Sequence, residues 1–399
     1  MSVAARIVVD PDSGGLRFDG VGALTNSSSR LLLDYPAPIR SRLLDYLFTP
    51  RYGASLQLLK LEIGADTNST TTAEPGHRRS RTHPPADRGW SWWMAQEAKA
   101  RNPDILLYGL LWGAPGWLDG GLWSADHVDY LVDWLDRARA RGLDIDYLGG
   151  ANESYDPPPT PEFFVALKAA LRRTHPHVRV VATDSHTPPD YWRAATAMRR
   201  DPAFEAAVDV LGEHDVCGWR TGYERCHVSA DAAALRAAGT PLWNSEQSSQ
   251  DVEAGAPALA RAMNRHYIDG RVTANINWPA IAAFYGNTAT GGTGLILADR
   301  PWSGEYLLGP SVWVDAHTTQ FTRPGWRYVD SGCGYLPGGG SHVALQDPAT
   351  GDVTIVVEAV DASAPQRVEL RLPDSLGTRE LTCWSTDLRS TDPDDWFVP

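Results

Sequence analysis

The chain has 399 residues, too many for one small core and too few for three full domains, so we expect one large domain with a smaller companion. Its 36 lysines and arginines against 49 aspartates and glutamates give a net charge of −13, which argues against a nucleic-acid binder and against a polybasic membrane-surface protein. The count of 16 tryptophans is unusual, and indole rings suit sugar faces as well as apolar cores.

The N-terminal segment, residues 1–10, lacks the long apolar stretch of a signal peptide, and no window reaches the roughly 18 apolar residues of a membrane span. We therefore expect a cytoplasmic protein, or a secreted one if a leader has been removed. The four cysteines are too few for a disulfide scaffold. Cys217 and Cys226 could bridge a short loop in an oxidising compartment, but free buried thiols are the favoured expectation.

Short apolar runs alternate with helical patterns over most of the chain. The predicted strands are Leu16–Thr25, Leu56–Gly64, Ile105–Gly113, Asp146–Glu153, Val178–Ser185, Asp209–Asp215, Pro241–Gln247 and Thr273–Pro279. The predicted helices cover residues 37–48, 90–101, 125–141, 161–174, 190–200, 230–238 and 253–268, with Ser124 and Thr160 as N-caps. Eight strands with intervening helices predict an α/β fold, a (β/α)8 TIM barrel over residues 16–318. The alternative is a doubly wound open sheet, but the Gly20-Val-Gly22 turn lacks the third glycine of a phosphate-binding loop.

The pattern changes after about residue 318. Turn signals at Gly338–Gly340 and Asp347–Asp352 separate alternating segments such as His342–Leu345 and Val353–Glu358. Residues 319–399 are therefore predicted to form a small C-terminal β-sandwich, completed by a strand from residues 1–15.

The carboxyl ends of the predicted strands carry acidic and aromatic residues, and this end of a (β/α)8 barrel supplies the reacting groups. Glu153 and Glu246 end the fourth and seventh strands, which lie across the barrel mouth from each other. Glycoside cleavage needs such a pair, one carboxyl protonated and one ionised. Asn152 can bond a sugar hydroxyl, and Trp112 and Trp278 offer apolar platforms. Helix capping or surface ion pairing by the two glutamates is the less favoured interpretation.

Other strand ends carry weaker candidates. Asp66, Asp184 and Glu213 could position the catalytic groups, although structural roles are equally expected. His214 could tune a neighbouring carboxylate, with an ordinary strand-end histidine as the commoner case. The histidine pairs of the chain have only loose metal spacing and no cysteine or paired acid beside them, so neither a metal nor a cofactor is predicted.

Several longer segments resemble the galactocerebrosidase family, glycoside hydrolase family 59. They are Ser28–Pro36, Leu44–Phe48, Tyr52–Leu56, Glu62–Asp66, Glu97–Pro103, Leu143–Tyr147, Pro301–Gly304 and Ala316–Thr322. The resemblance covers residues from about 16 to 335. It implies a retaining (β/α)8 enzyme in which Glu153 is the acid/base and Glu246 the nucleophile. It also implies sugar contacts from Thr70, Trp112, Asn152, Ser249 and Trp278.

Three features depart from the family pattern. The sequence has no counterpart of the C-terminal lectin-like domain of animal members, nor of the arginine that this domain sends into the active site. His214-Asp215 stands where the family tends to have His-Tyr, so the tyrosine that would orient the nucleophile is missing or comes from elsewhere. Ser154 follows Glu153 in place of proline or arginine.

The expected function is that of a retaining exo-acting glycoside hydrolase. Its substrates would be galactosylceramide-like lipids or other β-galactosides, without a nucleic-acid partner and without an integral membrane segment. The alternatives are an exo-β-glycosidase of other specificity, such as a β-glucosidase or β-xylosidase, and a non-catalytic carbohydrate-binding barrel. The oligomeric state is not indicated by the sequence.

Overall fold

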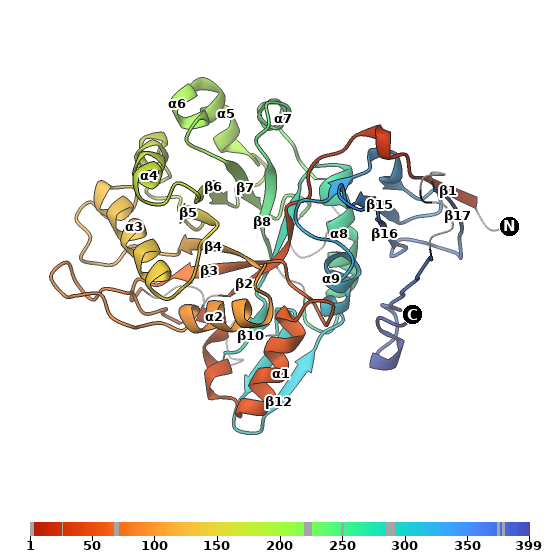
Figure 1. Cartoon of the computed structure of the whole chain (residues 1–399), viewed down its shortest axis with the longest axis horizontal. Coiled ribbons are helices and arrows are strands. Elements are labelled where there is room, and N and C mark those ends of the chain that lie inside the picture. Colours follow the sequence, from red (N-terminus) through yellow and green to blue (C-terminus); the bar gives the residue numbers. More distant parts are fainter. Residues whose placement is uncertain are drawn as a thin grey trace.

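A closed barrel of eight parallel strands forms the centre of the molecule (Figure 1). The structure is a computed structural model that describes residues 4–25, 27–67, 72–218, 226–248, 251–284, 292–372, 376 and 380–399. The barrel strands are β2 (Gly20–Thr25), β3 (Leu58–Ile63), β4 (Leu106–Leu111), β5 (Tyr147–Ala151), β6 (Arg179–Ser185), β7 (Val210–His214), β8 (Leu242–Ser248) and β9 (Ala274–Trp278). They pair in chain order, and β9 closes on β2 with Gly20 opposite Ala274. The predicted barrel is confirmed, and the open sheet is excluded.

Helices cover the outside of the barrel because both faces of its strands are apolar. They are α1 (Ala37–Phe48), α2 (Ser91–Arg101), α3 (Ala125–Ala140), α4 (Pro161–Thr174), α5 (Arg193–Arg200), α6 (Pro202–Glu205), α7 (Ala230–Ala237), α8 (Ala256–Ile268) and α9 (Ser311–Thr319). Ser124 and Thr160 accept backbone hydrogen bonds from His127 and Phe163, which confirms both predicted caps. The short helix α6 and the helix α9 were not predicted from the sequence.

Small sheets lie outside the barrel. The strands β10 (Ile281–Ala282), β11 (Ile296–Arg300) and β12 (Glu305–Leu308) form one of them. In the C-terminal part, β15 (Ser341–Gln346) pairs antiparallel with β13 (Arg327–Tyr328), β14 (Gly334–Tyr335) and β16 (Val353–Glu358). The N-terminal strand β1 (Ala4–Val8) pairs in parallel with β17 (Arg367–Arg371). Short 3-10 helices cover Pro11–Ser13, Ser27–Asp34, Asp330–Gly332 and Pro393–Asp395.

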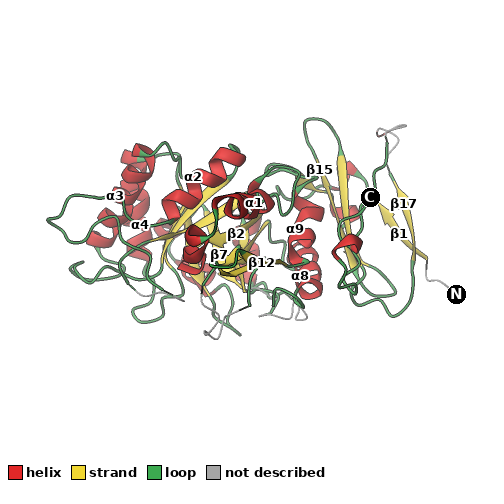
Figure 2. Ribbon diagram, turned by 90° about the horizontal axis from the view of Figure 1, so that it is seen from below, coloured by secondary structure: helices red, strands yellow, loops and turns green. Residues whose placement is uncertain are grey.

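The C-terminal sheets are layered on one side of the barrel. Figure 2 shows α8 and α9 next to the barrel, then the sheet of β15, then the β1–β17 pair. Tyr267 of α8 stacks on Tyr328 at 3.5 Å between ring centroids, which ties the β15 sheet to the barrel. Ile7 and Val9 from the N-terminal segment pack on Val329 and Ala344, so apolar contacts also join the two sheets.

One expectation about the cysteines is wrong. Cys217 and Cys226 form a disulfide across a separation of 9 residues, whereas free thiols were favoured from the sequence. Both cysteines are buried and lie after β7 (Val210–His214), and they form no Cys-x-x-Cys motif that would have marked the pairing in the sequence. Among the described residues, no helix combines the length and the apolar character needed to cross a bilayer.

Candidate active site

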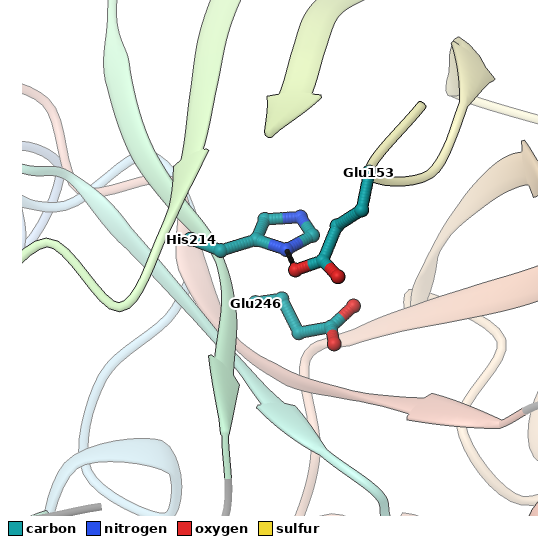
Figure 3. Close-up of side chains that lie close together, drawn as sticks. All are labelled: Glu153, His214 and Glu246. Atoms are coloured by element: carbon teal, nitrogen blue, oxygen red, sulfur yellow. Dashed lines mark hydrogen bonds and ion pairs between the residues drawn. The ribbon is translucent and has the colours of Figure 1, made fainter. Parts of the chain in front are cut away.

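The two predicted glutamates meet at the carboxyl end of the barrel. Glu153 lies two residues beyond β5, and Glu246 lies within β8. One carboxylate oxygen of each lies within 4.8 Å of the other and of a ring nitrogen of His214 (Figure 3). The side chain of Glu246 is 10% exposed, whereas that of Glu153 is 38% exposed. A separation this short matches the carboxyl spacing of retaining glycosidases and is below the roughly 6.5–9.5 Å of inverting ones.

Below the two glutamates lies a buried cluster of charged side chains. His214 Nδ1 is 2.9 Å from Glu153 Oε1, and its Nε2 is 3.6 Å from Asp184 Oδ1. The ammonium of Lys60 donates to Asp184 Oδ1 at 3.1 Å and to Glu246 Oε2 at 3.4 Å. Lys60, Asp184 and His214 are all at most 1% exposed. Positive and negative groups therefore alternate from one glutamate to the other.

The charges in this cluster determine its protonation. Burial acts to lower the pKa of His214, but the charge of Glu246 and the contacts with Asp184 and Glu153 outweigh it and raise the pKa to about 10. Burial acts to raise the pKa of Asp184, but the charge of Lys60 and the contact with His214 lower it to about 2. His214 is therefore an imidazolium and Asp184 a carboxylate at neutral pH.

The pKa values of the two glutamates are shifted in opposite directions. Burial raises the pKa of Glu246, against the opposing charges of His214 and Lys60. Burial also acts on Glu153, but the hydrogen bond and charge of His214 outweigh it and lower the pKa of Glu153. Of the two carboxyls, the deeper one, Glu246, therefore has the higher proton affinity.

Three of the predicted sugar-contacting residues, Trp112, Asn152 and Trp278, lie in the described part of the barrel. Trp112 packs against the barrel-interior cluster that contains Trp278 and Tyr108, and its ring centroid is 5.6 Å from Lys60 Nζ. Asn152 directly precedes Glu153, and within the described part of the chain its buried Oδ1 has no hydrogen-bond partner. The other two predicted contacts, Thr70 and Ser249, lie outside the described residues.

Asp215 occupies the position at which a tyrosine was expected from the family pattern. Its Oδ1 accepts from the backbone N–H of Ser248 at 2.7 Å and from Gln247 at 3.1 Å, and its Oδ2 accepts from the Ser248 hydroxyl at 2.8 Å. Its backbone N–H donates to the carbonyl of Glu246 at 2.9 Å. Asp215 thus fixes the backbone that follows Glu246 instead of contacting its carboxylate.

Of the weaker strand-end candidates, Asp184 and His214 enter the site, whereas Glu213 and Asp66 do not. Successive strand residues face opposite sides, so Glu213 points away from the barrel interior that His214 faces. Glu213 accepts from the Thr187 hydroxyl at 2.8 Å and from a backbone N–H beneath α5 at 3.2 Å, and Asp66 binds Arg88.

The backbone itself is unusual at this end of the barrel. Asp66, Glu153, Asp184 and Asp215 have left-handed φ angles of 56°, 42°, 53° and 51°. Non-glycine residues adopt this region infrequently, and asparagine and aspartate adopt it most readily. These positions turn the chain sharply at the strand ends.

The Glu153–His214–Glu246 trio offers three possible metal ligands. However, the ring nitrogens of His214 already face Glu153 and Asp184, and the Lys60 ammonium contacts Glu246. Because these two cations already offset most of the negative charge of Glu153, Asp184 and Glu246, the donor set suits ammonium and imidazolium better than an additional metal ion.

The prediction from sequence missed Lys60 and Tyr108, whose hydroxyl donates to Asp184 Oδ2. A signal for Lys60 was present, because a lysine interrupts the apolar run Leu58–Ile63 in a strand expected to be covered on both faces. Its partners come from β6 and β8 and could not be identified without the fold.

The chain is similar to known proteins over most of its length. The model for "Glycosyl hydrolase family 59" matches residues 18–320. The galactocerebrosidase of Homo sapiens is 39% identical over 381 residues, which are 92% of this chain and 52% of that protein. The galactocerebrosidase of Danio rerio is 38% identical over 378 residues, 92% of this chain and 54% of that protein. The chain therefore spans about half the length of these relatives.

Solved structures share the fold at low sequence identity. SrfJ from Salmonella typhimurium has a TM-score of 0.70 at 17% identity, covering 88% of this chain and 85% of its own. The catalytic domain of GH30 xylanase C from Talaromyces cellulolyticus has a TM-score of 0.66 at 17% identity, covering 87% and 85%. These likenesses support the barrel with its appended sheets.

Proposed function

The chain belongs to glycosyl hydrolase family 59, and from this membership we propose that it is a retaining exo-acting glycosidase that removes terminal β-galactosyl groups. The observation that carries the proposal is the approach of the Glu153 and Glu246 carboxylates to within 4.8 Å, with a ring nitrogen of His214 within the same distance of both. The substrates that we propose are galactosylceramide-like lipids or other β-galactosides, the first by analogy with the relatives named galactocerebrosidase.

In the proposed mechanism, Glu246 attacks the anomeric carbon while Glu153 protonates the departing oxygen. The covalent glycosyl-enzyme then reacts with a water molecule that Glu153 deprotonates. Esterification removes the charge of Glu246, so the proton affinity of Glu153 falls and the carboxylate can act as the base. One glutamate therefore serves in both steps without moving.

The order of these two pKa values is opposite to the one that the first step needs. Binding of substrate corrects this order, because Glu153 is 38% exposed and loses its water when an aglycone covers it. Loss of water disfavours a carboxylate and raises its pKa. Glu246 is already buried and changes less, so its contacts with Lys60 and His214 then favour ionisation.

The sugar itself would lie between the two glutamates and the tryptophans. Trp278 and Trp112 offer the apolar surface that suits the C–H face of galactose, and Asn152 offers an unused carbonyl oxygen for a hydroxyl. We assign Thr70 and Ser249 to the same role from the family resemblance alone.

The direct test compares Glu246→Gln with Glu213→Gln on an aryl β-galactoside. Both residues are buried glutamates at barrel strand ends, but Glu213 faces the helices. Loss of turnover by at least about a thousandfold is expected for Glu246→Gln only. Near-normal turnover of this variant would refute the nucleophile assignment, and an equal loss in Glu213→Gln would attribute the effect to folding.

Asp215 favours a second candidate, an exo-β-glycosidase with another sugar preference, because it replaces the tyrosine expected beside the nucleophile. A panel of aryl β-glycosides separates the two, since one epimeric hydroxyl without its partner leaves a buried polar group unpaired. Preferred hydrolysis of a glucoside or xyloside would select the second candidate. Sugar binding without any turnover would indicate a non-catalytic barrel.

A further inference from the structure

Lysine is rare in this protein, and one lysine lies at its centre. Of 36 basic residues, only Lys60, Lys99 and Lys168 are lysines. Lys60 lies in the middle of β3 with its side chain fully buried. A buried ammonium costs several kcal/mol unless its charge and its donors are matched, so its surroundings indicate what it does.

The ammonium of Lys60 has three acceptors. Its Nζ donates to the Ser245 carbonyl at 3.0 Å, to Asp184 Oδ1 at 3.1 Å and to Glu246 Oε2 at 3.4 Å. An ammonium carries three N–H groups, so each has an acceptor. Two of these acceptors belong to the strand segment that carries Glu246, so Lys60 contacts both its backbone and its carboxylate. The planar guanidinium of arginine would not reproduce this compact arrangement.

Asp184 holds the ammonium in place. One of its oxygens contacts Lys60, and the other accepts from the Tyr108 hydroxyl. The oxygen that contacts Lys60 also lies 3.6 Å from His214 Nε2. Asp184 is fully buried, so water cannot substitute for these partners.

On the basis of the proposed function, we propose that Lys60 is the positioning residue of the nucleophile. It orients the Glu246 carboxylate and keeps it ionised beside Glu153, with Asp184 as the anchor of the ammonium. Lys60 does not touch the substrate in this proposal, and it transfers no proton.

The charges around Glu246 explain why Lys60 is needed. The titratable groups that act on Glu246 from the surrounding strands and loops are Lys60, Tyr108, Glu153, Tyr155, Asp184, His214 and Asp215. Only Lys60 and His214 are cations in this set. His214 divides its two ring nitrogens between Glu153 and Asp184, whereas Lys60 donates directly to Glu246. Removal of Lys60 therefore leaves the nucleophile without its hydrogen-bonded cation.

The test measures the ionisation of Glu246 separately from that of Glu153. The probe is 2,4-dinitrophenyl 2-deoxy-2-fluoro-β-galactoside, whose leaving group departs with little acid assistance, so the pH dependence of labelling reports the nucleophile. In Lys60→Met the acid limb is expected to move up by about 1–3 pH units, the usual effect of losing an opposite charge in contact. Lys99→Met, which removes a surface lysine bound to a backbone carbonyl, should retain the wild-type profile.

A second variant addresses folding, because Lys60→Met leaves Asp184 buried without its cation. The double variant Lys60→Met/Asp184→Asn removes both charges, which costs less than breaking the pair. Its acid limb should still lie above that of the wild type, since Lys60 acts on Glu246 more strongly than Asp184 does. Thermal unfolding identifies which of the two variants is folded. The pH dependence of labelling in the folded variant then tests whether Lys60 keeps Glu246 ionised.

The outcomes separate the inference from the proposed function. If the wild type is labelled and the folded Lys60 variant has an unchanged acid limb, the inference is overturned. If the wild type neither turns over aryl β-galactosides nor becomes labelled, the proposed function fails first. An upward shift with an unchanged Lys99→Met profile supports Lys60 as the positioning residue.

Discussion

His214 connects the chemistry of the site to the stability of the protein. It is fully buried, and the contacts with Glu153 and Asp184 favour its charged form. We choose His214→Asn as the perturbation, because an asparagine amide can still donate toward Glu153 but carries no charge.

The magnitude follows from the two pKa values of His214. Burial opposes the charge, yet the surrounding carboxylates raise the pKa from 6.5 to about 10. At about 1.4 kcal/mol per pH unit, this interval corresponds to about 5 kcal/mol of unfolding free energy. This is an upper bound, because Glu153, Glu246 and Asp184 titrate together with the imidazole. Since the folded pKa is the higher one, the contribution is fully present below about pH 6.5 and disappears as the pH rises to about 10.

The assay is urea unfolding of the wild type and of His214→Asn at several values between about pH 5.5 and pH 10. The difference in unfolding free energy should be largest at the acid end of this range and should shrink toward pH 10. A constant m-value in each protein shows that the same transition is being compared.

His266 provides the matched control. It is also a fully buried histidine, but burial without a charged partner lowers its pKa to about 3. His266→Asn should therefore change stability by an amount that is constant from about pH 7 to pH 10. If the His214→Asn difference is equally constant over this range, His214 is not an imidazolium in the folded protein, and the alternation of charges described for the site is wrong.

Three further outcomes are expected. Glu153→Ala should slow hydrolysis of substrates with poor leaving groups about 10²–10⁴-fold, whereas activated aryl galactosides should still form the glycosyl-enzyme. Azide should then restore turnover of the activated substrates by reacting with the glycosyl-enzyme to give a β-galactosyl azide. Absence of that product by mass spectrometry would contradict the acid/base role. Cys217→Ser should lower the unfolding free energy by about 2–3 kcal/mol, the entropy of a loop this short, and a reductant should lower the melting temperature of the wild type but not of the variant. Thr160→Ala should cost about 1 kcal/mol in urea unfolding because Phe163 N–H loses its cap, whereas Thr160→Ser should be close to neutral.

The barrel could be predicted because its signals are local. Runs such as Leu106–Leu111 are apolar on both faces, and N-caps such as Thr160 are defined by a few neighbouring residues. The helix α9 was missed because three threonine and serine residues weaken its pattern, and its stability comes from packing on α8. Helices and strands could therefore be predicted where the residue propensities and the spacing of apolar residues indicated the same element.

Part of the candidate site could also be predicted, because the barrel fold determines where the strand ends lie. Glu153 and Glu246 could be paired because the carboxyl ends of barrel strands meet at one face. The contacts of Lys60 with Asp184 and Glu246 depend on which side chains of three separate strands face inward, and on their heights along the barrel axis. A change of one residue in strand register would have exchanged His214 for Glu213, so these partners required the structure.

The left-handed backbone at the strand ends also limits which substitutions the carboxyl end of the barrel can tolerate. Where Asp66, Asp184 and Asp215 stand, only residues that accept a positive φ leave the turn intact, chiefly asparagine, aspartate and glycine. Branched residues such as valine would distort the loops before they altered any contact with a ligand. Directed evolution of a new specificity should therefore vary neighbouring loop positions. In libraries randomised at these three sites, almost all folded clones should carry asparagine, aspartate or glycine.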